Sequence, residues 1–207
     1  ETVPLIKGGD TMKEEITDIL AYLQGDMNPE EHQVWERKIK LTFFNQNDQG
    51  IEDVNTILFK KDGSIYDENI TDNDGITLLK APYTSRDPYI LKAFYKGILV
   101  YDGYLRNSLI KTNFAIDIEL NNFTVEIRDN NNLPPGVELT PVLSSLQNND
   151  NIQIIPEEID AGNFIFKDIP SGKYKLQITY ANFVDEKIIN LPKDGNYFNV
   201  QFSAEFN

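Results

Sequence analysis

Gly162-Asn-Phe-Ile-Phe-Lys-Asp-Ile-Pro-Ser-Gly-Lys-Tyr-Lys-Leu-Gln-Ile-Thr-Tyr180 decides the fold of this chain. Apolar side chains recur at every second position, which is the spacing of a β-strand with one buried face. Pro170 and Gly172 interrupt the pattern with turn chemistry, because proline presets φ and glycine permits a positive φ. The stretch therefore predicts a strand, a tight connection and a second strand, paired as a hairpin. The positions expected to face the core are Phe164, Phe166, Tyr174, Leu176, Ile178 and Tyr180.

The same alternation begins near residue 38 and continues to residue 121. Polar turn signals separate the apolar runs at residues 45–50, at Asp62-Gly63 and at residues 71–75. Asp-Gly between two alternating runs is a strong hairpin signal. About seven short strands at this spacing, with no helix between them, are typical of an antiparallel sandwich.

The order of strands and turns then repeats between residue 122 and the end of the chain. A first strand at residues 123–127 precedes an Asn-rich turn, further strands, the 162–180 stretch and a final alternating run. We read this as a diverged internal duplication. The predicted fold class is mainly β, with two tandem Ig-like, transthyretin-like antiparallel sandwiches at residues 38–121 and 122–207.

Residues 1–37 differ from the rest and are predicted to form an extended segment followed by a short helical hairpin. Ile16, Ile19, Leu20 and Leu23 share one helical face. Gly25 is the usual residue beyond a helix C-terminus, and Asn28-Pro29 is a favourable start for a second helix.

The motif Gly162-x-Phe-x-Phe-x-Asp-Ile-Pro-x-Gly-x-Tyr-x-Leu-x-Ile178 resembles carboxypeptidase-regulatory-like, transthyretin-like and collagen-adhesin B-type sandwich domains. The resemblance spans roughly residues 38–207 and implies an accessory module without a fixed function. Adhesin members often carry a Lys–Asn isopeptide bond. Lys38 or Lys40 with Asn113 or Asn121 are the candidates here, but the acidic residue that promotes the bond has no clear match, so no bond is predicted.

The spacing of apolar residues and the Pro-Glu-Glu sequence at residues 16–31 resemble the N-terminal segment of anti-sigma factors. That resemblance implies a sigma-like or signalling partner. The zinc-binding members use a His and Cys cluster, whereas this chain has a single histidine, His32, and no cysteine. Zinc binding in that style is therefore excluded.

The charge and hydropathy of the chain limit the classes of molecule that it is expected to bind. A formal net charge of −14 disfavours nucleic acid and anionic membranes, since both require a basic face. No apolar run approaches the roughly 18–20 residues that span a bilayer. The partner is therefore expected to be a protein or a second copy of the chain.

Two compartments remain open. With one choice of codons, residues 7–12 can be back-translated to a ribosome-binding site followed by a start codon, which would place the natural start at Met12 and the protein in the cytoplasm. A chain that starts at Glu1 after removal of a signal peptide would instead be extracellular or at the cell surface.

Asp72-x-Asp74-Gly75 resembles part of a calcium loop, whose oxygen ligands suit a hard cation. Ile70 occupies the first ligand position, so a plain turn is favoured over a calcium site. No other cofactor is predicted. Two further groups of acids are weaker candidates for calcium or for solvated loops: Asp48, Glu52 and Asp53; and Glu157, Glu158 and Asp160.

No catalytic residue is predicted. The single histidine, His32, is expected to be an ordinary surface residue, and the chain lacks cysteine, a Gly-x-Ser-x-Gly elbow and a Gly-rich phosphate loop. Only carboxylates are left as candidate acids or bases. Tyrosines crowd the first half and could form a sugar-binding platform, although cross-strand packing is the simpler explanation. These are Tyr66, Tyr83, Tyr89, Tyr95, Tyr101 and Tyr104.

The sequence thus predicts a non-catalytic structural or interaction protein that acts in assembly or adhesion through its sheet edges and N-terminal segment. Thr2-Val-Pro-Leu-Ile6 is an apolar stretch suited to donation as a strand. A cytoplasmic adaptor that binds its partner through residues 12–39 is the first alternative. A carbohydrate-binding module is the second.

Overall fold

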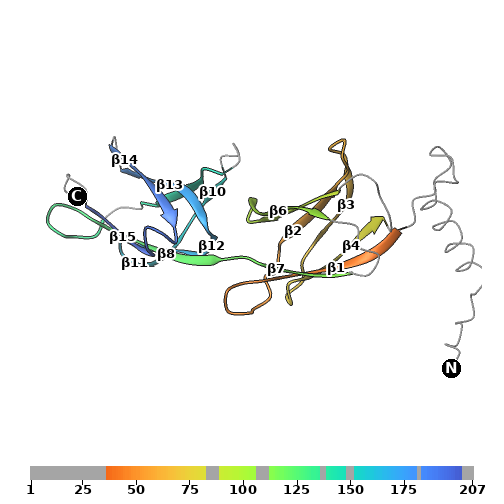
Figure 1. The fold of residues 1–207 in the computed structure, drawn as a ribbon. Coiled ribbons are helices and arrows are strands. Elements are labelled where there is room, and N and C mark those ends of the chain that lie inside the picture. Colours follow the sequence, from red (N-terminus) through yellow and green to blue (C-terminus); the bar gives the residue numbers. More distant parts are fainter. Residues whose placement is uncertain are drawn as a thin grey trace, which may run out of the picture.

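The computed structural model describes residues 36–82, 89–105, 112–135, 139–147, 152–180 and 183–201. These residues form fifteen β-strands in four sheets, which confirms the mainly-β class. The predicted helical hairpin and His32 lie outside the described residues. Two sandwiches lie end to end, and β8 follows β7 across the junction between them (Figure 1).

The first sandwich consists of a three-stranded sheet in the order β4-β1-β7 and a four-stranded sheet in the order β3-β2-β5-β6. Its strands are β1 (Glu36–Phe44), β2 (Asn55–Phe59), β3 (Ile65–Ile70), β4 (Ile76–Pro82), β5 (Tyr89–Tyr95), β6 (Ile98–Leu105) and β7 (Asn113–Asp117).

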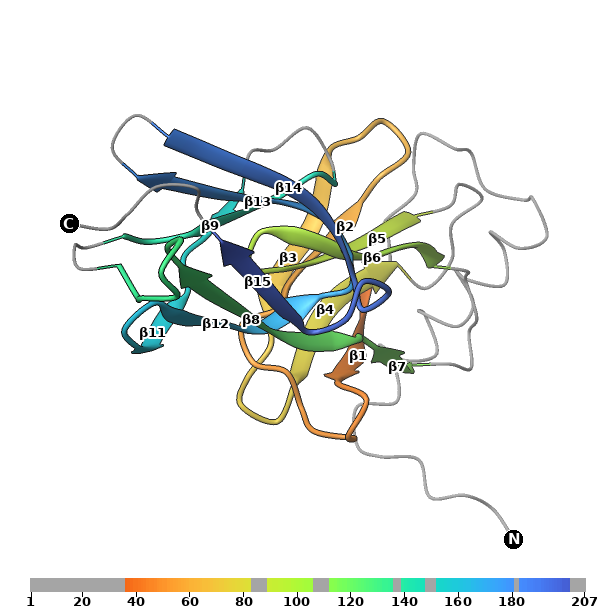
Figure 2. The ribbon, with the colours of Figure 1, turned by 90° about the vertical axis from the view of Figure 1, so that its left-hand side faces the viewer.

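The second sandwich has two four-stranded sheets in the orders β11-β12-β8-β15 and β10-β9-β13-β14, which form two layers in Figure 2. Its strands are β8 (Leu120–Arg128), β9 (Val142–Ser145), β10 (Gln153–Ile154), β11 (Glu157–Asp160), β12 (Asn163–Pro170), β13 (Gly172–Tyr180), β14 (Phe183–Leu191) and β15 (Tyr197–Gln201).

Both sandwiches share one plan of pairing. β1 and β8 each lie between an antiparallel neighbour (β4 and β12) and a parallel one (β7 and β15). The sandwiches are therefore antiparallel except for one parallel pair in each. Alternation could not predict that pair, because it reports which face is buried and not the direction of the neighbouring strand.

The prediction of a hairpin at residues 162–180 is wrong. β12 pairs with β8 and β11, whereas β13 pairs with β9 and β14 in the opposite sheet. The connection at Ser171 therefore crosses from one layer to the other, and the two apolar faces meet across the core. Gly172 also lacks the predicted positive φ, which occurs at Gly162 (73°) and Asp168 (52°) instead.

Each sandwich has its own hydrophobic core, built from the inward positions of the alternating runs. The first contains Ile39, Leu41, Phe43, Ile51, Val54, Leu58, Leu79, Ala81, Leu91, Ala93, Ile116, Ile118 and Leu120. The second contains Phe123, Val125, Ile127, Leu139, Leu143, Phe164, Phe166, Ile169, Tyr174, Leu176, Ile178, Ile189, Leu191 and Val200, together with Ile98 from the first sandwich.

Tyr174 lies in the core, as the alternation predicts. Its side chain is fully buried, and its hydroxyl donates to the carbonyl oxygen of Pro170 at 2.6 Å. A buried tyrosine that bonds to backbone a few residues upstream fixes the chain where it changes sheet. The bond therefore ties the Pro170 crossing to the second core.

We expect Tyr174→Phe to lower the free energy of unfolding by about 1–3 kcal/mol, because the buried Pro170 carbonyl loses its donor. Urea titration monitored by far-UV circular dichroism measures this change. Burial raises the pKa of Tyr174, so its phenol stays protonated in the folded chain at a pH of about 10, where the phenol of the unfolded chain ionises. The free energy of unfolding that the native chain has below this pH is therefore partly lost as the pH rises above it. The Phe variant lacks this phenol, so its free energy of unfolding should fall less over the same range. An unchanged alkaline profile would contradict this.

Candidate functional site

The Asp72–Gly75 loop is a compact turn closed by the Asp72 carboxylate. Its Oδ1 accepts the backbone N–H groups of Asp74 at 3.0 Å and Ile76 at 2.8 Å, and the N–H of Gly75 donates to the Asp72 carbonyl. Both carboxylates are exposed to solvent. Calcium binding by Asp72 and Asp74 stays a prediction.

The other acidic groups are separated by the fold. Glu52 and Asp53 of the first sandwich line a cleft between the sandwiches, whereas Glu157 of the second sandwich pairs with Lys167 at 2.5 Å. Glu158 and Asp160 accept local backbone N–H groups. Among the described residues, no three His, Cys, Asp or Glu side chains converge in a way that could hold a metal ion.

The tyrosines do not form one platform. Tyr66 and Tyr89 meet edge to face with ring centroids 5.1 Å apart, and Tyr95 and Tyr101 also pack against the first core. Tyr104 is the outlier, 66% exposed on β6. Tyr83 lies outside the described residues. The described tyrosines therefore do not all share one surface that could bind a carbohydrate.

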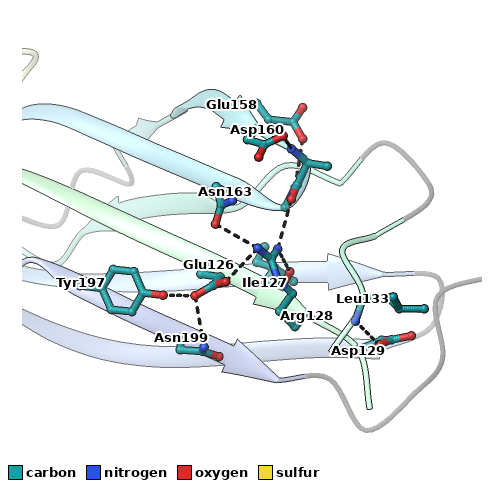
Figure 3. Close-up of polar contacts among 12 residues, drawn as sticks. Glu126, Ile127, Arg128, Asp129, Leu133, Glu158, Asp160, Asn163, Tyr197 and Asn199 are labelled. Carbon is teal, nitrogen blue, oxygen red and sulfur yellow. Dashed lines mark hydrogen bonds and ion pairs between the residues drawn. The ribbon is translucent and has the colours of Figure 1, made fainter. Parts of the chain in front are cut away.

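A polar network covers the outer face of β8 (Figure 3). The Arg128 guanidinium contacts Glu126 at 2.8 Å, Asn163 Oδ1 at 3.4 Å and the Ala161 carbonyl at 3.1 Å. Tyr197 donates its hydroxyl to the other oxygen of Glu126. The contacts join β8 to β12 and β15, so the network serves the sheet rather than a ligand.

The junction between the sandwiches is closely tied. The Gln46 amide makes two bonds to the backbone of Leu120, donating to its carbonyl at 2.7 Å and accepting from its N–H at 3.1 Å. Ser171 donates both its hydroxyl and its backbone N–H to Glu119. Lys96 donates to the carbonyl of Lys167 at 2.6 Å.

A cleft of about 890 Å³ lies beside this junction. Asp53, Lys96 and Asp168 line it, and all three adopt a positive φ, of 62°, 50° and 52°. Burial lowers the pKa of Lys96, and Asp168 opposes this by favouring the charged amine. Burial also raises the pKa of Tyr95, with a further contribution from Asp168 and Asp53. The cleft is thus polar, and the charge of Asp168 acts on both Lys96 and Tyr95.

The sandwich edges differ in how they are closed. On one side of the first sandwich, the side chains of Asp67 and Asn69 in β3 bond to the backbone of β4, at Lys80 N and Leu78 O. On the other side, a groove of about 390 Å³ separates β6 from β7. Leu91, Tyr101 and Tyr104 line it together with residues 114–117. This groove was not predicted from the sequence.

Lys40 and Asn113 are register partners on β1 and β7, which brings together one of the Lys–Asn pairs named from the adhesin resemblance. Both lie on the outer face, because the inward positions of β1 are Ile39, Leu41 and Phe43. Asn121 instead donates to the Ile169 carbonyl and to Ser171. Lys38 is exposed and pairs in register with Lys80 of β4.

No family model and no curated protein matches the sequence. Several solved structures are similar in shape. The minor pilin GBS52 of Streptococcus agalactiae is 12% identical with a TM-score of 0.44, covering 80% of this chain and 94% of its own. The shaft pilin SpaA of Lactobacillus rhamnosus GG is 10% identical with a TM-score of 0.38, covering 83% and 98%.

The Bacillus anthracis TIE protein is 14% identical with a TM-score of 0.38, and the match covers 81% of this chain but only 34% of that one. At such identities and TM-scores the fold rests on the strand pairing described above. Within the part of the chain that the structure describes, no helix has the length and apolar character needed to cross a membrane.

Proposed function

We propose that this chain is a non-catalytic structural subunit that assembles with further protein chains, with residues 38–121 and 122–207 acting as two tandem domains. The tied junction is the observation that carries the proposal. Gln46 bonds to Leu120 at the start of β8, and Ile98 of β6 is 1% exposed within the second core. Two sandwiches locked in this way suit a spacer that keeps its ends at a fixed separation.

The assembly contacts are assigned to sheet edges and to the N-terminal segment. An exposed edge strand carries unpaired backbone N–H and C=O groups, which an extended segment of another chain satisfies by β-augmentation. Thr2–Ile6 is apolar and uncharged, whereas the whole chain carries a formal net charge of −14. Contact through an uncharged segment avoids part of the repulsion between like-charged copies.

Deletion of residues 1–11 is expected to convert an assembling chain into monomers, because the donated segment is lost. Light scattering after size-exclusion chromatography measures the mass of each species over a concentration series. The matched control replaces residues 7–11 with a Gly/Ser stretch of equal length and keeps Thr2–Ile6. Unchanged assembly after the deletion would overturn the donor role, and a monomeric full-length chain at all concentrations would overturn the assembly proposal itself.

A further inference from the structure

The two sandwiches differ where the edge strands of their two facing sheets lie side by side, a place that we call the seam. The seam lies between β6 and β7 in the first sandwich and between β14 and β15 in the second. Register makes the comparison residue by residue. Leu91 of β5 pairs with Gly103, and Leu176 of β13 pairs with Lys187, so Gly103 and Lys187 are equivalent positions.

Lys187 closes the second seam. Its amine lies 3.6 Å from the centroid of the Phe198 ring, so the side chain bridges β14 and β15 through a cation–π contact. Asp185, the neighbouring inward position, faces Ile178 in register. Inward-pointing charges on an edge strand are a known protection against pairing with another chain.

Gly103 has no side chain with which to bridge the first seam from the position that Lys187 occupies in the second. A Cβ at Gly103 would lie 2.5 Å from the hydroxyl oxygen of Tyr101, which shows that the Tyr101 ring lies across the glycine. The groove of about 390 Å³ remains beside it, with Leu91 and Ile116 of the first core in its lining.

The outer edge of β7 offers backbone groups to this groove. Lys40 N donates to Thr112 O at 2.7 Å, and Ile118 N donates to Phe44 O at 2.9 Å. Even-numbered residues of β7 therefore bond toward β1, and the groups of Ala115 and Asp117 point to the open side. A strand added there would extend the three-stranded sheet β4-β1-β7.

We propose that this groove receives Thr2–Ile6 of a second copy of the chain as a strand beside β7. The inference rests on the proposed function and names its acceptor site. The segment is uncharged and matches the apolar lining. Pro4 lacks an N–H, so it fits when Val3 and Leu5 bond to β7 while Pro4 and Ile6 point into the groove. The stretch from residue 7 to residue 35, which links the segment to β1, is long enough to cover about 40 Å even at the ~1.5 Å rise per residue of a helix.

Disulfide trapping tests the site, because the chain has no cysteine of its own. Full-length Leu5→Cys is mixed under mild oxidation with full-length Ala115→Cys, and in parallel with Asn199→Cys. Register equates Asn199 on β15 with Ala115 on β7, so it is the matched control. Val3→Cys, two residues away, covers the adjacent register. We expect roughly tenfold more mixed dimer with Ala115→Cys than with Asn199→Cys.

Gly103→Lys gives the first sandwich the lysine that the second sandwich has at the equivalent position, Lys187. This substitution is expected to abolish both the trapped dimer and assembly. Gly103→Ala is the control, since it displaces the Tyr101 ring without adding a charge, and Gly103 has no positive φ to strain. Far-UV circular dichroism verifies folding of each variant. Equal trapping by Ala115→Cys and Asn199→Cys, or assembly that survives Gly103→Lys, overturns the groove while leaving the assembly role standing. Disulfides formed within one chain in a Leu5→Cys, Ala115→Cys double variant would overturn the second copy as donor.

Discussion

Gly75→Ala is expected to lower the free energy of unfolding by about 3–5 kcal/mol, whereas Gly63→Ala should cost only about 1–2 kcal/mol. Both glycines follow an aspartate, and both have a positive φ, of 73° at Gly75 and 84° at Gly63. A Cβ therefore strains the backbone conformation at either site. The two sites differ in the space that is available to the added Cβ.

A Cβ at Gly75 would lie 2.2 Å from the Phe43 carbonyl oxygen and 2.8 Å from the Cα of Gly50, whereas nothing lies within 4 Å at Gly63. Backbone atoms cannot move aside as a flexible side chain can. The Phe43 oxygen also accepts the N–H of Ile51 at 3.0 Å, so the added methyl group would disturb that bond too.

Urea titration of the two variants beside the native chain measures the difference. Equal destabilisation by both substitutions would contradict the argument from close approach and leave only the shared conformational strain. The result also bears on the calcium-like motif Asp72-x-Asp74-Gly75. A large loss at Gly75 would mean that the glycine is required for backbone packing against residues 43 and 50, without any role in binding calcium. Addition of calcium to the native chain is the separate test for Asp72 and Asp74.

The periodicity of the sequence predicted which side chains are buried, because alternation follows directly from the geometry of a strand. Phe164, Phe166, Tyr174, Leu176 and Ile178 all lie in the core as expected. Pairing was not accessible in the same way. A Pro-Ser-Gly connection is compatible with a hairpin and with a crossing between layers, and only the positions of β8 and β9 decide between them.

The groove between β6 and β7 could not be read from composition or motifs. The difference between Gly103 and Lys187 is present in the sequence and would have indicated the groove. It becomes visible only when the strand registers of both sandwiches show that the two positions are equivalent. The sequence could not separate cross-strand packing, the explanation favoured for the tyrosines, from a shared sugar-binding surface, for a related reason. Tyr95 and Tyr101 face the core on different strands, and a count of aromatic residues does not contain that information.

Ile98→Ala is expected to lower the free energy of unfolding by about 2–5 kcal/mol, the range for truncating a buried aliphatic side chain. Ile98 is 1% exposed and lies in the second core although β6 belongs to the first sandwich. The adjacent Gly97 approaches Ile152 so closely that a Cβ there would lie 3.1 Å from its Cδ1. The loss should therefore fall on the second sandwich and on the junction.

Differential scanning calorimetry of the full chain tests this expectation. The native chain should unfold in one transition, and the variant should show a separate transition for the weakened second sandwich. Ile65→Ala, at a side chain 51% exposed on β3, is the control and should change stability by less than about 0.5 kcal/mol. If Ile98→Ala behaved like that control, the junction would depend on the polar contacts of Gln46, Glu119 and Lys96 alone. Such a junction would pass little stability from one sandwich to the other, and the rigid spacer inferred from it would lose its main support.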